Sequence, residues 1–260
     1  MKNNTPPLPR WADLLQQLAT ADSKDDGKQF LVTDRRETLR RLLAGSACRL
    51  LAEGRLFLLY GQQPVAHRDI VLVSSHIDCV YRRCWCEEQA DTFRGTFDNA
   101  LTNAAVLHNL LEARFDAQVV VAFTGDEEKD SGGCHELVEY LCTQTGCRVR
   151  AVIVTDVTNE GWTAGSDFTL ENDLGIDLFT AYRLVASLRP YAFSFLHEAE
   201  PDESWDYHRF GLPVFSLCLP VAGELHGEEG VVCRKSSFPV YCQVLARLAN
   251  LLAEEEGQDS

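Results

Sequence analysis

Three consecutive carboxylates, Asp126, Glu127 and Glu128, follow the apolar segment 119–124 and a single glycine, Gly125. The segment is rich in β-branched residues, which predicts a strand buried on both faces of a parallel sheet. Ligands bind at the carboxyl edge of such sheets, so the three acids are expected at a binding edge. Because neighbouring carboxylates repel one another, we infer that cations neutralise them there.

Further residues suited to metal binding recur near the ends of other predicted strands, namely His76, Asp98, Asp156 and His226. His76, Glu128 and Asp156 each follow a buried apolar run, which places these three at one edge of the sheet. A set of carboxylates and imidazoles without thiolates suits Zn²⁺, Co²⁺ or Mn²⁺, and the histidines favour zinc.

Two aspartates have a particular place in this set. Asp98 has two oxygens and can bridge two metal ions about 3.5 Å apart, the arrangement of two-metal aminopeptidases. Asp78 stands two residues after His76 and can accept the other N–H of that imidazole, which would orient the ligand.

The order of these residues resembles that of the co-catalytic di-zinc exopeptidases, a superfamily of aminopeptidases and carboxypeptidases. The resemblance covers residues 56–235 and is carried by five segments: Ser75-His76-Ile77-Asp78, Gly95-Thr96-Phe97-Asp98-Asn99, Thr124-Gly125-Asp126-Glu127-Glu128, Thr155-Asp156 and His226-Gly227. It implies two zinc ions per chain. One would be held by His76, Asp98 and Asp156, and the other by Asp98, Glu128 and His226.

The resemblance also implies the catalytic roles. Glu127 would be the general base that takes a proton from water, and Asp78 would assist from behind His76. The reaction expected is removal of N-terminal residues from peptides or other small amide substrates.

The spacing of the ligands indicates which branch of the superfamily the chain resembles. Asp98 lies 22 residues after His76, too few for the lid domain that tetrahedral aminopeptidases insert there. His226 lies 70 residues after Asp156, too few for the dimerisation domain of the carboxypeptidase-like branch. The chain therefore resembles the compact single-domain aminopeptidases, although its 79–94 loop is longer than theirs.

Other functions fit part of the same pattern. A carboxypeptidase or an N-acyl amino acid deacylase could use the same two metals, and a glutaminyl cyclase shares the fold with one zinc. A non-catalytic binding protein on this scaffold is a further alternative. The intact His76 and the pair Glu127-Glu128 argue against the last two, and loops 79–94, 157–170 and 219–232 would set the substrate preference.

Several other polar residues have simpler explanations. Asp126 is interpreted as a solvent-facing neighbour of the two glutamates, and Arg82-Arg83 as a surface pair rather than a carboxylate-binding site. Asp202 is interpreted as a helix N-cap. The remaining polar candidates are histidines interpreted as surface or core residues: His108, His135, His197 and His208.

The elements expected to position these residues alternate along the chain. Helical periodicity predicts helices over 9–20, 34–52, 101–113, 135–142, 172–188, 204–210 and 236–254. Short apolar runs predict strands over 56–60, 69–75, 119–124, 149–155, 168–170, 192–196 and 213–218. The acidic end, 254–260, is expected to fray.

This alternation predicts an α/β fold with a mostly parallel, doubly wound sheet and helices on both faces. The whole chain, 1–260, is expected to form one catalytic domain, with a helical lead-in over 1–54 and a metallopeptidase-like core over 55–254. The sequence carries no indication of the oligomeric state.

Composition limits the other possibilities. A net charge of −15 argues against nucleic acids and anionic membranes as partners. Because the N-terminal residues lack an apolar signal core, a cytoplasmic location is expected. The ten cysteines are then expected to be reduced, with core positions for Cys48, Cys142, Cys218 and Cys242. Cys79, Cys84 and Cys86 lack a second pair at zinc-knuckle spacing, so no structural zinc is expected there.

Overall fold

The computed structural model describes residues 10–22 and 34–254, so all but the first residue of the segment predicted to fray, 254–260, lie outside the described residues. The helices are α1 (Trp11–Ala19), α2 (Asp34–Leu43), α3 (Ala100–Leu111), α4 (Gly132–Tyr140), α5 (Leu178–Ser187), α6 (Glu203–Arg209) and α7 (Ser237–Ala253). A π-helical turn, η2 (Leu141–Thr145), extends α4. The strands are β1 (Arg49–Glu53), β2 (Phe57–Gly61), β3 (Asp69–His76), β4 (Cys86–Glu88), β5 (Thr92–Gly95), β6 (Val119–Thr124), β7 (Arg148–Thr158), β8 (Phe168–Leu174), β9 (Phe193–Leu196), β10 (Val214–Ala222) and β11 (Val231–Arg234).

The centre of the sheet is parallel. Strands β6, β3, β7 and β10 lie side by side in that order, and all three of their pairings are parallel. Antiparallel strands extend the sheet on both sides, with β1 and β2 beyond β6 and with β8 beside β10. The prediction of an α/β fold built on a parallel, doubly wound sheet is confirmed, and the antiparallel margins were not predicted.

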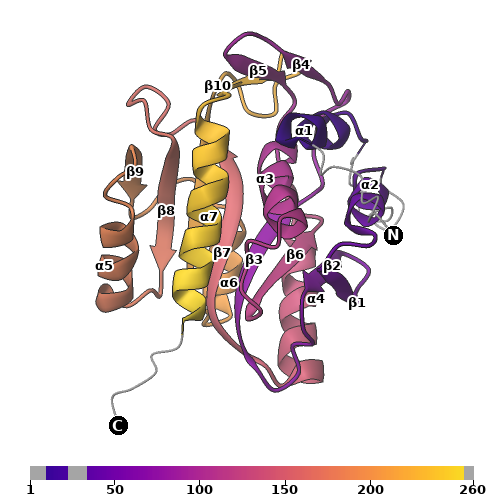
Figure 1. Cartoon of the computed structure of the whole chain (residues 1–260), viewed down its shortest axis with the longest axis vertical. Coiled ribbons are helices and arrows are strands. Elements are labelled where there is room, and N and C mark those ends of the chain that lie inside the picture. The colour runs from indigo at the N-terminus through magenta and orange to yellow at the C-terminus, as the bar shows by residue number, and fades with distance from the viewer. Residues whose placement is uncertain (1–9, 23–33, 255–260) are drawn as a thin grey trace, which may run out of the picture.

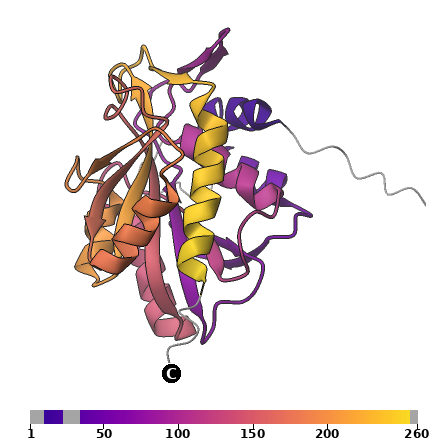
Figure 2. The same ribbon diagram turned by 60° about the vertical axis from the view of Figure 1, so that its left-hand side comes forward.

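Helices cover both faces of the sheet, as Figures 1 and 2 show. On one face α3 and α7 pack over side chains such as Val73, Val121 and Ile153, and α1 packs in turn against α3. On the other, α4 and α6 pack over Leu72, Val120 and neighbouring residues. Burial on both faces explains why the central strands consist of continuous apolar runs.

The face beneath α4 and α6 changes character along the strands. Side chains two residues apart on a strand point to the same face. Leu72 on β3 is apolar, but Ser74 and His76, which follow it at this spacing, are polar. On β7, Val154 is likewise followed by Asp156. The same face is therefore a hydrophobic core at one end of the strands and a polar site at their carboxyl ends.

Two helix predictions were wrong in part. The helix expected over 34–52 ends at Leu43, and Arg49–Glu53 form strand β1 instead, paired with β2. The helix expected over 172–188 begins only at Leu178, because β8 continues to Leu174 and Asp177 caps the helix N-terminus. Both segments are short and apolar, and periodicity does not separate helix from strand in such segments.

The loops predicted around the site contain three unpredicted strands. β4 lies within the 79–94 segment, whereas β5 and β11 extend past the ends of the 79–94 and 219–232 segments. They pair in the order β11, β5, β4, and β11 joins the end of β10. This small antiparallel sheet connects the segments before Asp98 and after His226. No helix among the described residues has both the length and the apolarity needed to cross a membrane.

Candidate metal centre

The predicted ligands come from five places in the fold. His76 is the last residue of β3, and Asp98 lies in the turn between β5 and α3. Glu128 follows β6, while His226 lies in the loop between β10 and β11. Asp156 lies inside β7 near its carboxyl end, not directly after the strand as predicted. The parallel strands bring His76, Glu128 and Asp156 to one edge, and the small antiparallel sheet brings Asp98 and His226 over it.

The structure brings all five predicted ligands together around Asp98. The His76 Nε2 lies 3.1 Å from Asp98 Oδ1 and 3.5 Å from Asp156 Oδ1. The His226 Nε2 lies 2.9 Å from Asp98 Oδ2 and 3.3 Å from Glu128 Oε2. Each oxygen of Asp98 thus faces a different histidine, as a carboxylate shared between two sites would.

Within the described part of the chain, three groups have ligand atoms close enough to hold one ion. They are His76 with Asp98 and Asp156, Asp98 with Glu128 and His226, and His76 with Glu127 and Glu128. The atoms of each group lie within 4.8 Å of one another. Two of these groups share Asp98, and their members are those that the sequence resemblance implies.

Glu127 lies beside the ligand cluster and opens onto a cleft. Its Oε2 is 3.9 Å from His76 Nδ1, and its side chain is 17% exposed, so water can reach it. Asp126 belongs to none of the three groups, and its backbone has a left-handed φ of 64°.

Asp78 lies behind the cluster and is completely buried. Its Oδ1 is 3.5 Å from His76 Nδ1, and its Oδ2 accepts a hydrogen bond from the backbone N–H of Glu128 at 3.2 Å. One carboxylate therefore holds residues from both β3 and the turn after β6.

The donor set fits divalent cations. Both ring nitrogens of His76, Asp98 Oδ1 and Glu128 Oε1 are buried without a hydrogen bond of ordinary geometry. Buried polar atoms are nearly always satisfied, so acceptors and imidazole nitrogens gathered in this way fit a site that binds cations. Oxygen and imidazole donors at this density match the preferences of Zn²⁺, Co²⁺ and Mn²⁺.

Burial and crowding shift the pKa values of the carboxyl groups apart. Burial raises the pKa of Glu127 to about 9, of Glu128 to about 8 and of Asp156 to about 6. For Asp98, burial acts in the same direction, but the facing imidazoles of His226 and His76 outweigh it and lower its pKa. A divalent cation stabilises the ionised carboxylates, so metal binding here would release protons.

A layer of polar side chains that sequence reasoning missed holds the ligands. The Asn103 side chain on α3 donates to the carbonyl oxygens of His76 and Asn99, at 2.8 and 2.7 Å. On the opposite side, the buried Glu203 accepts a hydrogen bond from Ser74 at 3.0 Å. Asn103 stands one helical turn after Asn99, which was the only available signal. The N-cap predicted for Asp202 is present, with Ser204 N–H donating to it at 2.9 Å.

A cleft of about 1040 Å³, part of it open to solvent, extends from the cluster across β7, β8 and the start of α6. Asp98, Glu127, Glu128, Asp156 and His226 line part of it. Other lining residues are Thr158, Asn159, Glu160, Glu171, Glu200, Asp202, Cys218 and Leu225. Of these, Thr158, Asn159, Glu160 and Leu225 lie in loops expected to set the substrate preference, whereas no sequence pattern provided a functional signal for Glu171, Glu200 and Cys218.

The remaining histidines and arginines lie away from this cluster. His135 pairs with Asp206 and His108 with Glu112, and neither histidine belongs to a group of potential metal ligands. Arg82 and Arg83 are exposed and do not line the cleft.

The ten cysteines are free thiols, and the position of one was predicted wrongly. Cys142 is exposed rather than buried in the core. The Cys79 and Cys84 sulfurs lie 3.8 Å apart, and no potential metal-binding group among the described residues contains a cysteine.

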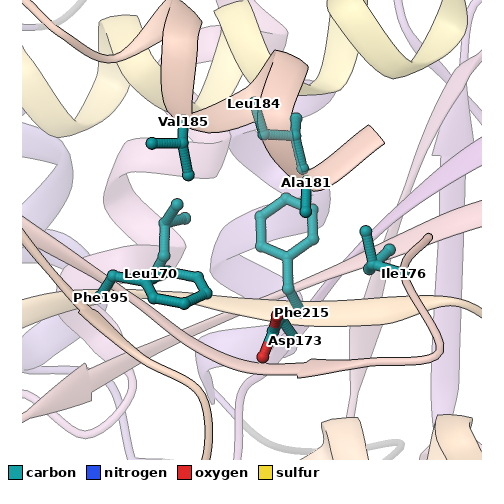
Figure 3. A pocket seen from close by; sticks show the side chains of 8 residues that line it. All are labelled: Leu170, Asp173, Ile176, Ala181, Leu184, Val185, Phe195 and Phe215. Atoms are coloured by element: carbon teal, nitrogen blue, oxygen red, sulfur yellow. The ribbon is translucent and has the colours of Figure 1, made fainter. Parts of the chain in front are cut away.

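A second hollow beneath α5 differs in chemistry. It is lined almost entirely by apolar side chains from β8, α5, β9 and β10, with Asp173 at its edge (Figure 3). Of these two cavities, only the cleft beside the ligand cluster is lined by side chains that could take part in a reaction.

Residues 59–206 match the model of a known protein family, described as peptidase family M28. Among curated proteins, no sequence matched the chain.

Solved structures share the fold at low sequence identity. A TET aminopeptidase from a Thaumarchaeota archaeon of marine sediment has a TM-score of 0.71 at 9% identity, over 92% of this chain and 95% of the other. An aminopeptidase from the archaeon Desulfurococcus kamchatkensis has a TM-score of 0.69 at 10% identity, over 94% and 95% of the two chains. A dinuclear metal-binding peptidase of the M20 family from Bacillus subtilis has a TM-score of 0.63 at 11% identity, over 94% and 98%.

Proposed function

The chain belongs to peptidase family M28, and from that premise we propose that it is an aminopeptidase that uses two divalent metal ions, with zinc as the native metal. The observation that carries the proposal is that two groups of potential ligands share Asp98. We assign His76, Asp98 and Asp156 to one ion, and Asp98, Glu128 and His226 to the other.

The metal ions would supply Lewis acidity, which acidifies a water molecule and polarises the scissile carbonyl. Glu127 takes the proton of the attacking water, since it is the carboxylate that lies beside the cluster and borders the cleft. Once the oxygen has bonded to the carbonyl carbon, the same group donates the proton to the leaving nitrogen as the C–N bond breaks, so that a neutral amine departs. Asp78 orients His76 and the turn that carries Glu128.

The charge of the cleft favours an aminopeptidase over a carboxypeptidase or an N-acyl amino acid deacylase. Those enzymes must recognise a free carboxylate, for which a guanidinium is the usual partner. The residues lining the cleft include eight carboxylates and no Lys or Arg. Such a cleft repels a substrate carboxylate and attracts a free α-amine.

Removal of metal is expected to abolish hydrolysis, and readdition of Zn²⁺, Co²⁺ or Mn²⁺ to restore it. Elemental analysis of the native protein should give about two ions per chain, the number that the shared Asp98 implies. Activity that persists after chelation, with no metal left on the protein, would exclude the proposed chemistry.

The reaction class is tested by offering three substrate types side by side. Aminoacyl para-nitroanilides should be cleaved, whereas N-acyl amino acids and peptides with a blocked N-terminus should not. Preferential hydrolysis of the blocked compounds would assign the site to a deacylase or a carboxypeptidase instead.

Replacing Asp78 with Asn is expected to weaken metal binding by roughly 10- to 100-fold, the usual effect of removing a carboxylate behind a histidine ligand. The asparagine preserves size but loses the charge that faces His76 Nδ1. Competition with a chelating dye measures the affinity. Asp69→Asn, at the solvent-exposed start of the same strand, is the matched control and should bind metal as the native protein does. Equal affinities in both variants would remove Asp78 from its role.

A further inference from the structure

The cleft beside the proposed metal centre carries more negative charge than two divalent ions can balance. Eight carboxylates line the whole cleft. Two divalent ions would balance four of them, those of Asp98, Glu127, Glu128 and Asp156. The four that remain, Glu160, Glu171, Glu200 and Asp202, are called here the distal acids.

The distal acids differ in depth. Glu160 and Glu200 are exposed at the rim. Glu171 is only 4% exposed, on β8, and Asp202 is partly buried at the N-terminus of α6. Burial of a carboxylate without a cation is costly, and a function that needs the negative charge is a reason for it.

No described Lys or Arg is found in an ion pair with any distal acid, and none lines the cleft. Glu171 accepts a hydrogen bond from the Thr169 hydroxyl at 2.5 Å, and Asp202 accepts from Ser204, so their neighbours are neutral donors. These contacts hold the two carboxylates in place without neutralising them.

Ser216 lies beside both Glu171 and Asp202. On β10 it is paired in register with Glu171, and its completely buried hydroxyl contacts the Asp202 carboxylate. Burial raises the pKa of Asp202, whereas this contact acts to lower it and so favours the ionised form. Ser216 lies on the same sheet face as Glu171 and Cys218, both of which line the cleft.

We propose that the distal acids form a pocket for the cationic side chain of a substrate, so that the preferred peptides begin with lysine or arginine. This inference rests on the proposed aminopeptidase function, because the metal centre defines where the scissile bond lies. Glu171 and Asp202 would contact the ammonium or guanidinium directly, and Glu160 and Glu200 at the rim would raise its local concentration. Burial raises the pKa of Glu171 to about 7, and a bound cation would favour its ionised form.

The test compares two amino alcohols that lack a scissile bond, L-lysinol and L-norleucinol, by isothermal titration calorimetry on the metal-loaded protein. The two probes have similar length and the same α-amine, so they differ mainly in side-chain charge. Lysinol is expected to bind at least 10-fold more tightly. In the Glu171→Gln, Asp202→Asn double variant this preference should fall by roughly 30-fold or disappear, the usual effect of removing the partner of a buried charge.

The substitutions are chosen to preserve the fold. Glutamine can still accept the hydrogen bond from Thr169, and asparagine is as good an N-cap as aspartate. Glu198→Gln is the matched control, since Glu198 is exposed on the same connecting segment but does not line the cleft, and it should leave the preference unchanged.

Failure of the inference is distinguishable from failure of the proposed function. Equal affinities of the native protein for lysinol and norleucinol, or an undiminished preference in the double variant, would overturn the cationic pocket whatever the turnover. Lack of hydrolysis of every aminoacyl para-nitroanilide, with lysinol still preferred, would overturn the aminopeptidase assignment and leave the pocket supported.

Discussion

A Glu127→Gln protein is expected to lose hydrolysis by about 10²- to 10⁴-fold, the contribution of a well-placed general base. Glutamine has nearly the same shape as glutamate but cannot take the proton from water. We assign the metal ions to the other carboxylates, so metal content should stay near two ions per chain. Turnover of an aminoacyl para-nitroanilide and elemental analysis of the same sample measure the two quantities.

The neighbouring carboxylate provides the control for this experiment. Asp126 precedes Glu127, belongs to no potential metal-binding group and has a left-handed φ of 64°. Asparagine tolerates that backbone conformation, so Asp126→Asn should fold and keep native activity.

Two results would contradict the assignment of Glu127. An active Glu127→Gln protein would show that another group takes the proton. Loss of one metal ion would show that the group of His76, Glu127 and Glu128 is the one occupied, which makes Glu127 a ligand.

Asp98→Ala is expected to have the largest effect on metal binding of any single substitution. Asp98 belongs to two of the three potential groups and faces both His76 and His226. Its loss should weaken binding of both ions by more than the 10- to 100-fold caused by loss of an outer partner, and hydrolysis should become undetectable. Elemental analysis after dialysis against a defined free-metal concentration gives the remaining content.

His226→Ala is the informative comparison. His226 is a member of one group only, and its side chain is 53% exposed, so its removal leaves no buried cavity. This variant should keep about one ion per chain while Asp98→Ala keeps close to none. Equal metal content in the two variants would mean that Asp98 is not shared.

The central strands could be predicted because strands that are buried on both faces consist of consecutive apolar residues. Segments such as 70–73 and 119–123 are apolar on both faces, and this pattern is typical of a parallel sheet covered by helices. Polar residues follow near the end of each such run, and the carboxyl ends of parallel strands meet at one edge. The proximity of His76, Glu128 and Asp156 therefore follows from local sequence patterns.

Outside the central strands, local sequence patterns were ambiguous or gave no indication of the structure. Arg49–Glu53 has the apolar content of a helix, and only its pairing with β2 makes it a strand. In the sequence, Asn103 and Glu203 look like ordinary helical residues. Their hydrogen bonds near the site are made with His76 and Ser74, which are distant in sequence, so no local pattern indicates them. Glu171 lies between the predicted strand 168–170 and the helix wrongly predicted from 172, so its position in the cleft could not be inferred.

The sequence by itself determined which residue types are available at the sheet edge and in what order they occur, because strand burial and strand ends are local properties of the chain. Only the tertiary structure decided that Asp98 stands between His76 and His226. The loop with Asp98 follows β5 and the loop with His226 precedes β11, and the pairing of these two strands brings the loops together. The same holds for the distal acids, which separate segments of the chain bring to one cleft. Contacts between distant segments depend on packing of the whole domain, and that packing has no signature in any short stretch of sequence.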